Sequence, residues 1–176
     1  MNVGVGHFRL LANVSTVELC AKPFVHLSKH ADRIMHFYMI LVSSTGLAGA
    51  RWRRLQLDVT SDYQPDGTIP QVTVTERDRI PSGTHMGRLL SFAILDEDVS
   101  VGCLLEILTE AGLDSVTVNA HDAACGRFCF RSLKMFADVG LIRGDWAPDA
   151  YEWHEEIGVA SAELGVMMKE EDLINL

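Results

Sequence analysis

A cysteine and a distant histidine are the residues best suited to carry chemistry. Cys125 lies in the segment A-A-C-G-R-F-C-F, where a helix is predicted to begin, and His36 stands near the start of an apolar segment predicted to be a strand. The amide groups of a helix N-terminus lower the pKa of a thiol, and an imidazole can take its proton. We therefore predict Cys125 as a nucleophile and His36 as its base. A cysteine on a helix is more often a small buried core residue, so a structural role for Cys125 is the alternative.

A carboxylate is predicted to complete this pair. Met35–Val42 is strongly apolar, and Trp52–Thr60 alternates between apolar and polar residues. Glycines separate the two segments, so we expect an antiparallel hairpin. A turn centred near Leu47 puts His36 opposite Asp58, with the two Cβ atoms ~5 Å apart. Asp58 could then orient the imidazole. A slip of one residue would separate the two side chains to opposite faces, and a surface histidine or a strand-end acid is the plainer alternative.

A metal site is the weaker interpretation of the same residues. His121, Cys125 and Cys129 are spaced four apart and could offer ligands from one helix face. A zinc site needs four ligands, or three and a water, and the sequence offers no second cluster of matching type. We predict neither a metal nor a cofactor.

The remaining pattern predicts an α+β fold with an antiparallel sheet and helices packed on one side. Further strands are expected at 16–21 (closed by Pro23), 72–76, 88–95 and 115–119. Helices are expected at 99–112, 125–139 and 150–168, with Ser100 as an N-cap and Gly112 and Gly140 as terminators. A single domain is expected over residues 1–176, with fraying of the last residues, Lys169 to Leu176.

Composition narrows the possible partners. Hydrophobic residues make up 48% of the chain and the formal net charge is −9, so the chain has little surplus of cations to neutralise nucleic acid. No apolar run approaches the ~18 residues of a membrane span. The first residues, Met1 to Ser15, lack a signal-peptide pattern, and the four cysteines form no CxxC pair. We expect a cytoplasmic protein that binds a small-molecule substrate and neither nucleic acid nor membrane.

These stretches resemble a fungal family of unknown function. Its pattern has an Asn-His-Trp start to an apolar strand, a Leu-Asp-Met-Thr strand, and a Gly-Cys-Arg opening to a helix that ends in Ala-Gly-Leu-Ile. The corresponding stretches are M-H-F at 35–37, L-D-V-T at 57–60, A-C-G-R-F at 124–128 and V-G-L-I at 139–142. The chain departs from the pattern at Met35, at Phe37 and at Gly126, which interrupts Cys-Arg.

The order of histidine strand, polar residue on the next strand and cysteine on a later helix also resembles the permuted papain-like clan, which includes the lecithin–retinol acyltransferases. This is a likeness of layout, and it implies thiol-based acyl transfer or hydrolysis. We predict a small cysteine-dependent enzyme acting on a lipophilic or metabolite-sized substrate, with Cys125 as nucleophile, His36 as base and then acid, and Asp58 as orienter. The alternatives are a cofactor-free cyclase or isomerase, a small-molecule-binding protein on the same fold, and a structural or partner-binding domain.

Overall fold

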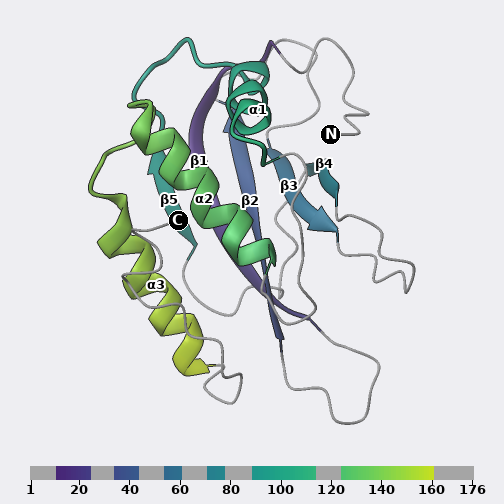
Figure 1. The fold of residues 1–176 in the computed structure, drawn as a ribbon, viewed down its shortest axis with the longest axis vertical. Helices are drawn as coiled ribbons and strands as arrows, with labels where there is room; N and C mark the ends of the chain where they lie inside the picture. Colours follow the sequence, from purple (N-terminus) through teal and green to yellow (C-terminus); the bar gives the residue numbers. More distant parts are fainter. Residues whose placement is uncertain are drawn as a thin grey trace.

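The computed structural model of the chain describes residues 11–24, 34–43, 54–60, 71–77, 89–113 and 124–160. Five strands form one antiparallel sheet in the order β4-β3-β2-β1-β5 (Figure 1). Their bounds are β1 Val14–Phe24, β2 Ile34–Ser43, β3 Arg54–Thr60, β4 Gln71–Arg77 and β5 Leu90–Ala93. Three helices follow the sheet in the chain, so the predicted α+β class is confirmed.

The first strand in the chain, β1, is longer than its sequence pattern indicates. Pro23 was expected to close it, yet β1 runs on to Phe24 and Pro23 lies opposite Met35 of β2. A proline lacks an N–H, but every second residue of an antiparallel strand directs its N–H away from a given neighbour, so a strand can continue through it. Because of this extension, the start of β2 is paired with β1 up to Ile34, and His36 lies opposite Lys22.

The helices begin and end largely where their caps predict. Helix α1 spans Val101–Glu110, and its N-cap Ser100 accepts a hydrogen bond from the Cys103 N–H at 3.2 Å. Helix α2 spans Ala124–Asp138. Gly112 and Gly140 follow α1 and α2 with φ of 69° and 77°, the left-handed conformation that ends helices.

Helix α3 is the exception, because it spans Trp146–Ala160 and so begins four residues before the predicted start at Ala150. The sequence W-A-P at 146–148 predicts a join between segments, but Pro148 lies in the first turn of α3. There the N–H that proline lacks would have had no helical partner in any case. Residues beyond Ala160 lie outside the described part of the chain, as do the predicted strand at 115–119, the turn around Leu47, His121 and the C-terminal tail.

The two faces of the sheet bury different clusters. Phe37, Met39 and Leu41 of β2 point to the helical side and join the main core, which also takes in the apolar faces of α1, α2 and α3. Helix α2 crosses the sheet over β2 and β3 (Figure 1). On the opposite face, here called the far face, Tyr38 and Ile40 pack with Cys20. Among the described helices, none is long and apolar enough to cross a membrane.

Candidate active site

His36 and Asp58 come together on the far face of the sheet. The His36 Nε2 atom lies 2.6 Å from Asp58 Oδ1, and the two side chains are only 14% and 13% exposed. His36 shares its face with Tyr38, on which its ring stacks at a centroid distance of 6.3 Å. The imidazole therefore sits between a carboxylate and an aromatic ring, largely shielded from solvent.

The register that produces this contact differs from the predicted one. Met39 lies opposite Leu57, two positions further along β3 than a turn centred on Leu47 gives, so the predicted register was wrong. His36 and Asp58 are therefore diagonal rather than direct neighbours. A shift of two residues keeps every side chain on its face, and a diagonal pair is still within reach of long or aromatic side chains.

A second donor holds the other oxygen of the carboxylate. Gln56 lies two residues before Asp58 on β3, on the same face, and is 4% exposed. Its amide Nε2 donates to Asp58 Oδ2 at 2.8 Å. Both oxygens of Asp58 are thus bonded to buried or half-buried side chains, which restricts rotation of the carboxylate plane.

Cys125 meets β2 at the end of the ladder between β2 and β3. The paired register stops at Met39 and Leu57, although both strands continue. Just past this point, the backbone N–H of Phe37 donates to the Sγ atom of Cys125 at 3.5 Å. A thiol that projects from the helical side of the sheet thereby reaches the strand position next to His36.

A glycine allows helix α2 to come this close. A Cβ atom on Gly126 would lie 3.3 Å from Cδ2 of the Phe37 ring, tighter than ordinary van der Waals contact. The first turn of α2 therefore rests on the Phe37 ring. No acidic residue occupies the first turn of α2, so within that turn no carboxylate offsets the partial positive charge of the helix start.

The environment of His36 favours its protonated form. Burial lowers the pKa of His36, but its hydrogen bonds to Asp58 and Cys125 and the charges of both outweigh burial and raise the pKa from 6.5 to about 9. Since Nε2 is bonded to Asp58, Nδ1 is the ring nitrogen left to exchange a proton with the thiol. The structure therefore brings the three predicted residues together as a thiol, an imidazole and a carboxylate.

The other thiols have surroundings that differ from those of Cys125. Cys129, one turn further along α2, is buried in the core, and burial raises its pKa well above the ordinary value. Burial, followed by the charge of Glu18, raises the pKa of Cys20 to about 12. Cys103 is exposed at the start of α1. Within the described part of the chain, Cys125 alone among the four cysteines combines partial exposure with an imidazole neighbour.

An aromatic cluster from α2 and α3 supports the Phe37 ring. His154 stacks on Phe37 at a centroid distance of 5.8 Å, and Trp153 and Phe130 meet the same ring at 5.9 and 6.2 Å. His154 is 7% exposed, and its Nδ1 atom makes no hydrogen bond with the described residues. The polar and aromatic run at 151–156 predicts a pocket wall or a solvated helix face, whereas Trp153 and His154 of this run are buried in the structure.

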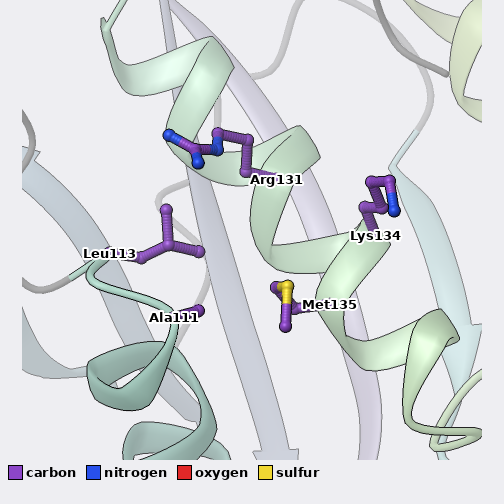
Figure 2. A pocket seen from close by; sticks show the side chains of 5 residues that line it. All are labelled: Ala111, Leu113, Arg131, Lys134 and Met135. Carbon is purple, nitrogen blue, oxygen red and sulfur yellow. The ribbon is translucent and has the colours of Figure 1, made fainter. Parts of the chain in front are cut away.

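The hollow between α1 and α2 is separate from this site. It is lined by Ala111, Leu113, Arg131, Lys134 and Met135. Figure 2 shows Leu113, just past the end of α1, across from Met135 of α2, with Arg131 extending toward the side of Leu113 and Lys134 away from it. None of Cys125, His36 and Asp58 lines it, so it is no part of the candidate active site.

Comparison with known proteins adds no assignment: the chain matches no protein-family model, no curated protein and no solved structure.

Sequence reasoning missed three residues of the site. Gln56 could have been found from the alternation Q-L-D, which puts Gln56 and Asp58 on one face. Gly126 was seen only as an interruption of a motif, whereas its role is steric. Phe37 acts through its backbone N–H and its ring position, and neither leaves a signal in a single sequence.

Proposed function

We propose that the protein is a cysteine-dependent enzyme that transfers or hydrolyses an acyl group of a lipophilic or metabolite-sized substrate. The single observation that carries the proposal is the chain of contacts from Cys125 through His36 to Asp58, with the 2.6 Å bond between His36 and Asp58 at its end. A shielded imidazole that is bonded to a carboxylate on one side and to a thiol on the other is the arrangement that activates a sulfur nucleophile.

In the first half-reaction, His36 holds the proton given up by the Cys125 thiol, as its raised pKa favours, and the sulfur attacks the carbonyl carbon of the substrate. The carbonyl oxygen becomes an oxyanion, for which the backbone N–H groups at the start of α2, which have no partner within the helix, are suitable donors. When the tetrahedral adduct collapses, the bond to the leaving group breaks and the leaving group takes the proton from His36. Cys125 is left as an acyl thioester.

In the second half-reaction, water or an acceptor hydroxyl or amine attacks the thioester carbon. His36 accepts the proton of the attacking group, and collapse of the second adduct breaks the carbon–sulfur bond. The products are an acid, or an acyl group on the acceptor, and the regenerated thiol–imidazole pair. Asp58 stabilises the imidazolium in both halves and remains ionised.

The layout of histidine strand, acid strand and cysteine helix resembles that of the permuted papain-like clan, and we include this likeness in the proposal as an analogy. We also propose a cytoplasmic location, because a catalytic thiol and three further free cysteines suit a reducing compartment.

The test compares the thiols directly. Brief treatment with iodoacetamide at neutral pH, followed by peptide mapping, should label Cys125 faster than Cys20, Cys103 and Cys129. Incubation with a p-nitrophenyl ester should then add one acyl group to Cys125, visible as an intact-mass shift that hydroxylamine reverses. We expect Cys125→Ala to abolish the adduct while the melting curve stays cooperative.

Cys103→Ala is the matched control, since Cys103 is the exposed thiol at the start of another helix. It should leave the acyl adduct unchanged. Labelling of Cys125 no faster than that of Cys103, or full ester turnover by a folded Cys125→Ala variant, would remove the acyl-enzyme mechanism. The same fold would then be read as a binding protein or a cofactor-free cyclase or isomerase.

A further inference from the structure

Gln56 is a buried amide whose donor is directed to the carboxylate of the site. It lies in the middle of the sheet, opposite Ile40 on β2 and Thr75 on β4, and is only 4% exposed. A buried amide is costly to place in a sheet unless its polar atoms are bonded. Its Nε2 atom donates a hydrogen bond to Asp58 Oδ2 at 2.8 Å, whereas His36 is bonded to the other oxygen, Oδ1.

The geometry gives this bond a specific consequence. A carboxylate held through Oδ1 alone can rotate about its Cβ–Cγ bond, because that torsion is broad. Two bonds from two different strands, β2 through His36 and β3 through Gln56, fix the plane. The Nε2 atom of His36 then has one preferred partner direction, and Nδ1 is turned toward Cys125 in consequence.

We propose that Gln56 is a positioning residue of the site, which holds Asp58 so that His36 keeps the tautomer and the orientation required to face Cys125. The inference rests on the proposed function for its catalytic meaning. Its structural part, the control of His36 by Gln56, can be measured without any substrate.

The experiment uses the full chain and the variant Gln56→Met, which keeps the length of the side chain and removes the donor. Two quantities are measured: the pKa of His36, by NMR titration of its ring nitrogens, and the rate of Cys125 alkylation as a function of pH. We expect the pKa of His36 to fall by about 1 and the alkylation rate at neutral pH to fall several-fold. If Gln56→Met folds poorly, Gln56→Val, which has a higher strand propensity, is expected to show the same two changes.

Arg54→Met is the matched control. Arg54 lies two residues earlier on β3, on the same face, and pairs with Glu18 at 3.7 Å rather than with Asp58. It should lower the melting temperature without lowering the pKa of His36, so a general loss of stability is distinguished from a loss of positioning.

The two proposals fail in different ways. An unchanged titration of His36 in both Gln56 variants would overturn the positioning role, whatever the reactivity of Cys125. A shifted titration of His36 in a protein whose Cys125 forms no acyl adduct would keep the positioning role and remove the proposed enzyme.

Discussion

The two described histidines that lie near Phe37 have similar burial and opposite electrostatics. His36, on the far face, is paired with a carboxylate, and its pKa is raised to about 9. His154, on α3, stacks on the ring of Phe37, and burial lowers its pKa. Both rings lie against aromatic neighbours, so aromatic packing does not separate them. The difference lies in the partners: His36 is bonded to a carboxylate at 2.6 Å and also interacts with Cys125, whereas the charge of Glu155 does not offset the burial of His154.

This comparison shows which observation identifies a candidate base. Burial disfavours the charged form of any histidine, and on its own it produces a neutral side chain such as His154. Only a partner that stabilises the imidazolium can make a buried histidine hold a proton at neutral pH. A histidine that must stabilise positive charge during a reaction needs that partner, and among these two only His36 has it.

Asp58→Asn is expected to have the largest effect on the difference in pKa between His36 and His154. The substitution preserves shape and removes the charge, so the pKa of His36 should fall by 1 to 3, as expected for loss of a close opposite charge. The rate of Cys125 alkylation at neutral pH should fall by about tenfold or more. NMR titration of His36 and peptide mapping of the alkylated thiols measure the two effects.

His154→Phe is the matched control for Asp58→Asn. It retains a ring against Phe37 and removes the buried nitrogen, so the titration of His36 and the labelling of Cys125 should be unchanged. Equal loss of Cys125 reactivity in the two variants would mean that packing around Phe37, and not the carboxylate, sets the reactivity.

The second effect separates the histidines by pH. The pKa of His36 is higher in the folded state than its ordinary 6.5, so its contribution to stability is fully present below pH 6.5 and is lost as the pH rises toward 9. The contribution is on the order of 2 kcal/mol, with allowance for residual exposure. The pKa of His154 is lowered, so the folded state instead loses stability as the pH falls below 6.5.

Urea denaturation across pH 5 to 9.5 measures these two windows. Asp58→Asn should flatten the loss of stability above pH 6.5, and His154→Phe should flatten the loss below it. Between pH 6.5 and 9, the wild-type protein should lose more stability than Asp58→Asn. An equal loss in the two proteins would contradict the assignment of the raised pKa to the His36–Asp58 pair.

The parts of the fold that local chemistry controls could be predicted from the sequence. The cap at Ser100 and the left-handed glycines Gly112 and Gly140 act within one helical turn, and all three are confirmed. His36 and Asp58 were predicted to share a face from the expected hairpin register, and they do so because the observed register differs from it by two residues.

The parts that depend on distant contacts could not be predicted. The register of β2 and β3 depends on the whole length of pairing, and one sequence does not fix the centre of the turn. The predicted register was wrong by two residues, and the pair survived because an even slip preserves the face. The burial of Trp153 and His154 depends on packing against Phe37, a residue more than a hundred positions away.

The smallest expected effect tests the contact that brings α2 onto β2. In Gly126→Ala, the new methyl group would meet Phe37 Cδ2 at 3.3 Å, so the ring must move by a few tenths of an ångström. The gain in helix propensity, about 1 kcal/mol, should offset most of the packing cost, so the free energy of unfolding should change by less than about 1 kcal/mol. The contact between the Phe37 N–H and Cys125 Sγ, already 3.5 Å long, should lengthen.

Cys125 alkylation in Gly126→Ala should therefore slow by about two- to fivefold, a free-energy change of below about 1 kcal/mol by the usual conversion. Gly144→Ala is the matched control, because a Cβ atom there meets nothing within 4 Å. Unchanged alkylation in Gly126→Ala would show that the Phe37 N–H does not hold the thiol, and that the pairing with His36 alone sets its reactivity. A slower rate at unchanged stability would instead show that the close approach of α2 to β2 tunes Cys125, in the way that Asp58 tunes His36 from the far face.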